Sequence, residues 1–351
     1  MRPLLYFLQV TFSSLGAVAR WAAHLLPVVL PVVVVAALGC SAVLAQPGPA
    51  PTVRLSADAN PLAGRPFYVD PISRAMTAAK NANPPSPELT TIANTPQAYW
   101  LDHAFPTSTV ASTVSRYAGA AQAAGAMPIL ALYAIPYRDC GSFAAGGFAT
   151  AAGYRGWIDA IAAGLGDLPA AIILEPDALA MADCLSPDQR QERFDLISYA
   201  VDTLTRNPAA VLYVDGGHSR WVSAEVMAER LNAVGVDQAR GFSLNITNYY
   251  TTEEEIGYGE TISALTNGSH YVIDTSRNGA GPIPDAPLSW CNPEGRAMGV
   301  APTTATAGPH ADAYLWLKRV GESDGACERG DPPAGRFVNE LAIELVRNAG
   351  Q

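Results

Sequence analysis

The sequence predicts an α/β fold in which a parallel sheet closes into a barrel of about seven strands. Short, continuously apolar segments alternate along the chain with amphipathic helical patterns. Apolar strands of this kind are typical of a parallel sheet buried on both faces, with the helices as crossovers. A doubly wound open sheet is the alternative, but no GxGxxG motif follows the first strand, as a dinucleotide-binding sheet would require.

The elements follow one another in a regular order. Seven apolar segments are predicted strands: 98–101, 128–135, 170–174, 209–214, 241–246, 271–273 and 313–317. The helical patterns between them cover residues 108–124, 153–165, 187–205, 224–234 and 252–265. No internal repeat at a fixed period is present.

The N-terminal segment, residues 1–45, is predicted to be a secretory signal peptide. Arg2 and Arg20 precede an apolar run at residues 25–45 that ends in a small-residue cleavage pattern. An uncleaved membrane anchor and lipidation of Cys40 are weaker alternatives, because two prolines interrupt the run and the residue three positions before this cysteine is an alanine. We therefore expect secretion into the medium, and attachment at the cell surface stays open.

Two further segments complete the predicted organisation. Residues 46–54 form a short Pro-rich spacer, and residues 55–351 form a single catalytic-sized domain.

Removal of residues 1–45 takes away two basic and no acidic residues, so the net charge changes from −10 to −12. This charge disfavours nucleic acid and anionic lipid as partners. We expect a monomer without stable membrane association after signal cleavage.

Four cysteines remain after the predicted signal peptide: Cys140, Cys184, Cys291 and Cys327. An even number in an oxidising compartment predicts two disulfides, for which three pairings are possible. A zinc site is the alternative, but the chain contains neither CxxC nor HExxH. We expect no metal and no organic cofactor.

Polar side chains stand at the end of nearly every predicted strand: Asp102, Asp139, Glu175, Asp177, Asp215, Asn245, Asn248, Asp274, Glu322 and Asp324. The carboxyl ends of parallel barrel strands meet at one rim, so we expect these groups to converge there. Helix capping and turn formation are the alternative explanation for any single aspartate.

Clustered carboxylates favour acid/base hydrolysis of an acetal. The chain has no phosphate-binding loop, and like charges in one cleft raise the pKa of at least one carboxyl group. Aromatic residues that could stack on sugar rings lie among them: Tyr99, Trp100, Tyr133, Trp221, Trp290 and Trp316. Trp221 and Trp290, in polar loops, are the best candidates.

Five blocks of sequence resemble glycoside hydrolase family 6, the inverting cellulases that include endoglucanases and cellobiohydrolases. These blocks are YAIPYRDC at 133–140, LEPDAL at 174–179, YVDGGHSRW at 213–221, IDTSRNG at 273–279 and LWLKRVGESDG at 315–325. They occur in the family's order and cover nearly all of residues 55–350. The resemblance implies a distorted, incompletely closed β/α barrel and disulfides paired in sequence order.

The resemblance also implies catalytic roles. Asp177 matches the general acid, and Asp139 matches a residue that keeps the pKa of the acid high and helps to orient water. The base is either Asp324 or, through a chain of water molecules, Asp139. Tyr133 matches a tyrosine beside the reactive sugar ring, placed to favour ring distortion. The predicted substrate-binding residues, with Trp100 added from the aromatic set, are Trp100, Asp215, His218, Trp221, Asn248, Trp290, Lys318 and Glu322.

One position departs from the family pattern. Ala145 stands where the family has a serine that helps to hold the catalytic water. Ser142 or a backbone group is expected to replace it, or the enzyme is slow by about 10- to 1000-fold.

These features together predict a secreted endo-β-1,4-glucanase that acts on cellulose or a related β-glucan with inversion. An open cleft is expected because fewer than about 300 residues leave little length for loops that roof a tunnel. One alternative is a glucan-binding protein with weak or no catalysis, and another is an inverting glucanase with a different β-glucan as substrate.

Overall fold

The structure is a computed structural model that describes residues 59–284 and 286–350. The contacts divide the chain into two units, Met1–Leu55 and Ser56–Gln351, and every described residue belongs to the second. The predicted signal peptide and spacer lie outside the described residues. Within the part that is described, no helix is both long and apolar enough to cross a bilayer.

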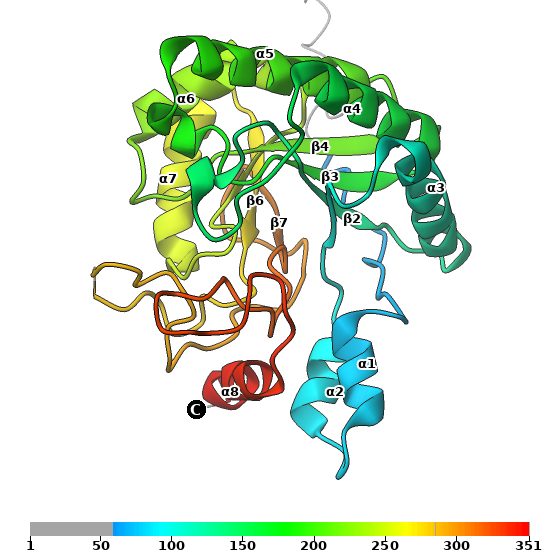
Figure 1. Cartoon of the computed structure of the whole chain (residues 1–351), viewed down its shortest axis with the longest axis vertical. Helices are drawn as coiled ribbons and strands as arrows, with labels where there is room; N and C mark the ends of the chain where they lie inside the picture. Colours follow the sequence, from blue (N-terminus) through cyan, green and yellow to red (C-terminus); the bar gives the residue numbers. More distant parts are fainter. Residues whose placement is uncertain (1–58, 285, 351) are drawn as a thin grey trace, which may run out of the picture. The chain divides into compact units, whose positions relative to one another are not determined.

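Seven parallel strands form one sheet in the order β1-β2-β3-β4-β5-β6-β7 (Figure 1). Their bounds are β1 Tyr99–Asp102, β2 Ile129–Tyr133, β3 Ala170–Leu174, β4 Ala210–Asp215, β5 Gly241–Leu244, β6 His270–Asp274 and β7 Ala311–Leu315. Each predicted strand overlaps one of them, so the predicted α/β fold with a curled parallel sheet is confirmed.

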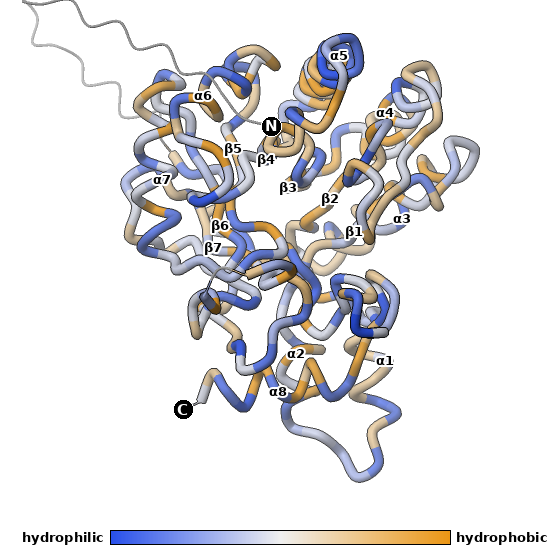
Figure 2. The backbone as a smooth tube through the Cα atoms, turned by 60° about the vertical axis from the view of Figure 1, so that its left-hand side comes forward, coloured by the Kyte–Doolittle hydropathy of each residue, from blue (hydrophilic) through white to orange (hydrophobic). Residues whose placement is uncertain are grey.

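The strands are recognisable in the sequence because both of their faces are covered. Every residue of β2 and β3 is buried, and Figure 2 shows hydrophobic residues along both strands. One set of side chains packs between the sheet and the surrounding helices, and the other fills the inside of the curled sheet. Continuous apolar strands are the result.

One group of helices covers the outside of the sheet, and a second group forms a separate cluster (Figure 1). The outer layer contains α3 Thr107–Ala123, α4 Ala151–Leu165, α5 Pro187–Leu204, α6 Ala224–Ala233 and α7 Thr252–Leu265. The cluster contains α1 Arg74–Asn81, α2 Pro87–Ala93 and α8 Asn339–Ala349, and three 3₁₀ turns occupy Asp139–Gly141 (η1), Ala180–Cys184 (η2) and Val236–Gln238 (η3). The five outer helices agree with the predicted ones.

The barrel has an open seam between β1 and β7. No ladder pairs these two strands in the described sheet, but Ala98 N donates to Trp316 O at 3.0 Å, and Trp100 Nε1 donates to Leu317 O at 2.8 Å. The described residues of the long connection between β6 and β7 contain no α-helix. The expectation of an incompletely closed barrel is therefore confirmed.

Two disulfides fasten loops of the domain. Cys140 is bonded to Cys184, and Cys291 is bonded to Cys327. The first joins η1 to η2. This pairing in sequence order is the one that the resemblance implied.

Candidate active site

A cavity of about 290 Å³ lies at the carboxyl ends of the strands. Eight predicted site residues line it: Trp100, Tyr133, Asp139, Asp177, Trp290, Lys318, Glu322 and Asp324. They come from β1, β2 and the segments after β2, β3, β6 and β7. The parallel strands thus bring together side chains that lie up to 224 positions apart in the sequence.

Asp177 lies in the turn after β3 in a left-handed backbone conformation, with φ 70°. Its backbone N–H donates to Asp215 Oδ2 at 2.8 Å, which holds this strained turn in place. Burial, followed by the charges of Asp215 and Asp139, raises the pKa of Asp177 well above its ordinary value. The carboxyl group therefore keeps its proton at a pH where an exposed aspartate has lost it.

Asp139 belongs to the loop after β2 and also has a left-handed backbone, with φ 56°. Its Oδ2 accepts a hydrogen bond from Ala144 N at 2.7 Å, and the Ser142 hydroxyl lowers its pKa, although burial has the larger effect and leaves the pKa raised. Gly147 is required at the end of this loop because a Cβ there would lie 1.9 Å from Ile135 O.

Arg138 fastens the same loop to β2. Its guanidinium donates to Tyr133 O at 2.7 Å and to Ala144 O at 2.8 Å, and it lies 4.5 Å from the Tyr133 ring centroid. The Trp100 and Tyr133 rings meet edge to face at 5.4 Å. Burial raises the pKa of Tyr133 well above its ordinary value, so its hydroxyl stays protonated beside Asp177.

Asp324 is bound on several sides. Arg277 Nη1 donates to Oδ1 at 3.0 Å and to Oδ2 at 2.8 Å, and Lys318 Nζ lies 2.9 Å from Oδ1. Asn292 N and the Tyr249 hydroxyl donate to Oδ2 at 3.1 and 3.4 Å. Burial alone would raise the pKa of Asp324, but the two cations overcome this effect and hold it at about 2. Asp324 is therefore an ionised carboxylate that is fixed in the cavity wall by these contacts.

Other polar residues at the strand ends hold the loops instead of lining the cavity. Glu175 accepts from Ala134 N and Ile135 N, and Asp274 accepts from the backbone N–H groups of four residues: Thr247, Ser276, Leu317 and Lys318. Buried N–H groups of irregular loops need such acceptors. The sequence predicted that the strand-end carboxylates meet at one rim; five of them line the cavity, whereas Glu175, Asp215 and Asp274 do not.

Asp215 is a specific correction. The sequence predicted a substrate contact, but this residue is buried beneath Asp177 and does not line the cavity. Its oxygens accept from Asp177 N, from Gly217 N at 3.0 Å and from Ser243 Oγ at 3.1 Å. Burial raises the pKa of Asp215 to about 7. Asp215 therefore supports the turn that carries Asp177.

The remaining predicted substrate-binding residues, His218, Trp221 and Asn248, do not line the main cavity. His218 packs against Trp221 at 5.1 Å and stacks on Tyr250 at 4.4 Å between ring centroids. Trp221 is 37% exposed. Asn248 lines a small hollow with Trp290, which also lines the main cavity. Their contact with substrate stays a prediction.

Sequence reasoning missed several cavity residues and one buried partner: Arg138, Phe143, Thr247, Arg319 and Arg277. Arg138 and Arg277 lie inside the blocks YAIPYRDC and IDTSRNG that carried the resemblance. The sequence therefore pointed to these positions, but it did not indicate what the two side chains contact. Phe143 packs against Trp290 at 6.0 Å between ring centroids. Loop contacts of this kind leave no periodic signal in a sequence.

The side chains that line the cavity are suited to acid/base chemistry. Across the described ranges, no three His, Cys, Asp or Glu side chains are grouped so that they could hold a metal ion. Asp324 already has its two cations within the protein. Among the carboxyl groups that line the cavity, burial raises the pKa of Asp177 and of Asp139, and these two groups can exchange protons.

Comparisons with known proteins agree on one family. The family model described as glycosyl hydrolases family 6 matches residues 59–349. Endoglucanase A of Cellulomonas fimi is 44% identical over 285 residues, which cover 81% of this chain and 61% of that protein. Endoglucanase A of Thermobispora bispora is 43% identical over 292 residues, which cover 81% and 62%. The chain thus spans about three fifths of the length of these relatives.

A solved structure of a similar protein matches this chain over the whole length of the solved chain. The endoglucanase Cel6 from Mycobacterium tuberculosis, in complex with methyl-cellobiosyl-4-deoxy-4-thio-β-D-cellobioside, superposes with a TM-score of 0.83. It is 76% identical, and the match covers 84% of this chain and 100% of that one.

Proposed function

The chain belongs to glycosyl hydrolases family 6, and from this premise we propose that it is an endo-β-1,4-glucanase that hydrolyses cellulose or a related β-glucan with inversion. The observation that carries the proposal is Asp177, which has a strongly raised pKa and shares one cavity with Asp139 and Asp324. An inverting glycosidase needs a protonated carboxyl group and an ionised carboxylate that leave room for a water between them.

In the proposed reaction, the Asp177 carboxyl group donates its proton to the glycosidic oxygen as the bond from this oxygen to C1 breaks. A water molecule attacks C1 from the opposite face of the ring, and its proton passes to a carboxylate. One water is consumed, and the β-linkage becomes an α-hydroxyl group on the new reducing end. Tyr133 lines the cavity within hydrogen-bonding reach of Asp177, which supports its proposed place beside the reacting ring.

We assign the proton-accepting role to Asp139, acting through water. A carboxylate with a pKa of about 2 is a poor proton acceptor, and Asp324 is already bound by Arg277 and Lys318. The pKa of Asp139 is raised, which makes its ionised form the better base. The fixed negative charge of Asp324 would then stabilise positive charge that develops on the sugar ring.

The loop beside Asp139 decides between an efficient enzyme and a glucan-binding protein with weak catalysis. Ala145 lines the cavity and has no hydroxyl group for the water. Ala144 N and Ser142 contact Asp139 instead. We propose that these groups preserve activity at a reduced rate, because all three aspartates are in place.

Endo action and secretion complete the proposal. The relatives from C. fimi, T. bispora and M. tuberculosis bear the name endoglucanase, and the last of these binds a thio-linked cello-oligosaccharide analogue. Two disulfides fit an oxidising compartment outside the cytosol. A neutral glucan fits the acidic chain better than a polyanion does.

The test compares wild type with Asp177→Ala on hydroxyethylcellulose, a neutral soluble cellulose derivative, and on a panel of other soluble β-glucans. An endo-acting enzyme lowers viscosity faster than reducing ends appear, and the variant should lose at least about 100-fold in rate. Equal background rates in both proteins, together with retained cellulose binding, would favour the binding protein. The panel identifies which β-glucan is cut.

A further inference from the structure

A second cavity, larger than the first, lies against the open seam of the barrel. Its volume is about 500 Å³, within the range of ordinary ligand-binding clefts. Four residues line both cavities: Trp100, Asp102, Arg319 and Glu322. We call the second cavity the seam chamber, and we call these four residues, which line both cavities, the neck.

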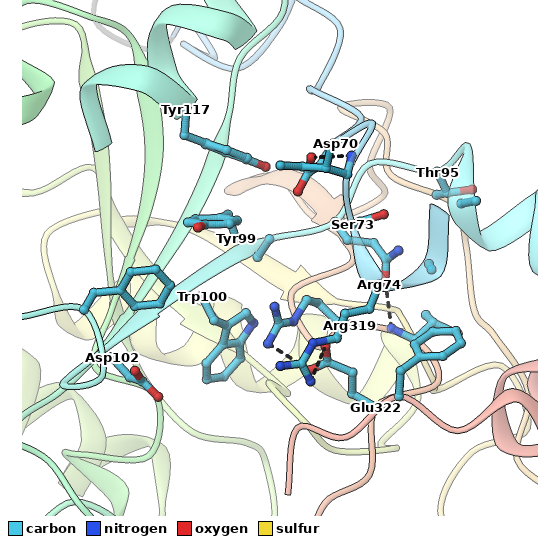
Figure 3. Close-up of a pocket in the computed structure, with 18 of the residues that line it drawn as sticks. Asp70, Ser73, Arg74, Thr95, Tyr99, Trp100, Asp102, Tyr117, Arg319 and Glu322 are labelled. Carbon is cyan, nitrogen blue, oxygen red and sulfur yellow. Dashed lines mark hydrogen bonds and ion pairs between the residues drawn. The ribbon is translucent and has the colours of Figure 1, made fainter. Parts of the chain in front are cut away.

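Aromatic side chains form one side of the seam chamber (Figure 3). Tyr99 of β1 stacks on Tyr117 of α3, with ring centroids 4.2 Å apart and planes inclined by 23°. Phe105 packs edge-on against Tyr99 at 6.0 Å. Burial raises the pKa of both tyrosines, so their hydroxyl groups stay protonated and can donate hydrogen bonds.

Polar groups form the opposite side. Asp70, Ser73 and Arg74 come from the start of α1 and the segment before it, and Figure 3 shows the Tyr117 hydroxyl pointing towards Asp70. Asp70 Oδ1 accepts from Ile72 N at 2.9 Å. Aromatic faces opposite hydrogen-bonding groups are the surroundings that suit a sugar ring, which has apolar faces and a polar edge.

The neck holds polar atoms without hydrogen-bond partners. Glu322 Oε2 pairs with Arg319 Nη2 at 2.8 Å, but Glu322 Oε1 and Arg319 Nε are buried and make no hydrogen bond within the described residues. Arg74 Nη1 lies 3.8 Å from Oε1, which is too far for a hydrogen bond. Buried polar groups of this kind are normally satisfied, so a hydroxyl-bearing ligand would complete them.

The charges around the seam chamber nearly cancel. Three carboxylates, Asp70, Asp102 and Glu322, stand against two guanidinium groups, Arg74 and Arg319. A strongly charged ligand would leave one of these groups uncompensated, whereas a neutral polyhydroxyl chain would not. The ligand class therefore agrees with the one proposed for the active-site cavity.

We propose that the seam chamber binds the continuation of the glucan chain beyond the sugar units held around Asp177. The inference rests on the proposed function. It makes the open seam a part of the substrate path: the chain passes the neck between Trp100 and Glu322 and lies between the Tyr99–Tyr117 pair and Asp70. Oligosaccharides long enough to reach the chamber gain affinity from it.

The test measures binding of cellotetraose, cellopentaose and cellohexaose by calorimetry in Asp177→Asn enzyme, which cannot cut them. Affinity should rise at least about fivefold from cellotetraose to cellohexaose, as one to two additional hydrogen bonds imply. Adding Asp70→Asn and Tyr117→Phe should reduce this rise to less than about twofold. Both substitutions keep the packing of the original side chain, and thermal unfolding verifies that the fold is intact.

Tyr68→Phe is the matched control. Tyr68 packs edge to face on Tyr117 at 5.4 Å but does not line the chamber, so the rise in affinity should persist. A constant affinity from cellotetraose to cellohexaose, or equal effects of the control and the chamber variants, would overturn the inference while leaving the proposed function intact. Failure of the proposed function has a different result, because wild type would then cut none of the oligosaccharides, whether or not it binds them.

Discussion

Replacing Asp324 by Asn removes a buried negative charge that two cations require. Arg277 is 1% and Lys318 is 9% exposed, and both lie within 3 Å of the carboxylate. Removing one partner of a buried ion pair costs about 3–5 kcal/mol because the remaining charge is left uncompensated. For a domain of this size each kcal/mol corresponds to about 2 °C, so Asp324→Asn should unfold about 6–10 °C below wild type.

Asp139→Asn is the matched control, because it removes a charge from the same cavity without leaving a cation unpaired. The amide oxygen can still accept from Ala144 N, so the loss of stability should stay near 1 kcal/mol. Calorimetry and urea unfolding of both variants measure the difference, and hydrolysis of cellotetraose measures activity. If Asp324→Asn kept wild-type stability and lost all activity while Asp139→Asn stayed active, the roles would be reversed: Asp324 would be the base, and Asp139 would not.

Three further predictions concern buried groups and the catalytic loop. Burial raises the pKa of Glu255 to about 8 from 4.5, so its contribution to stability is full below about pH 4.5 and is lost as the pH rises from there through about 8; the melting temperature of wild type should fall between about pH 4.5 and 8, and less so in Glu255→Gln. Ala145→Ser should raise kcat on cellotetraose by about 10-fold or more if the missing hydroxyl limits water placement, and an unchanged kcat would show that the present loop already suffices. Replacing Cys140 and Cys184 together by alanine should lower kcat by up to about 100-fold, because Asp139 is fixed next to this disulfide; a drop in melting temperature with unchanged kcat would contradict that reason.

The strands were predictable because burial on both faces leaves an unbroken apolar run. β3 begins and ends where the sequence predicted, at Ala170–Leu174, and α7 was also predicted with its correct bounds, Thr252–Leu265. The cluster of α1, α2 and α8 was not predicted. α1 is a polar helix of eight residues, and short helices of this kind depend on tertiary packing more than on their own pattern. Ser86 followed by Pro87 was a usable start signal for α2.

The site was predictable in its chemistry more than in its geometry. The position of Asp177 after a buried strand placed it at the correct rim, but nothing in its neighbourhood in the sequence distinguishes it from Asp215 or Asp274. These two residues accept backbone hydrogen bonds from loops that fold back over the strand ends. Which carboxylate faces the cavity depends on where those loops run, and this is decided by contacts distant in the sequence. The ion pair of Asp324 with Arg277 has the same origin.

The anomeric form of the first product tests the central claim most directly. Proton NMR during hydrolysis of cellotetraose should show the α-anomer appearing first and the β-anomer growing in by mutarotation, and Asp177→Ala should show neither above background. A β-anomer as the first product, or an Asp177→Ala variant that is as active as wild type, would contradict an inverting reaction with Asp177 as the acid.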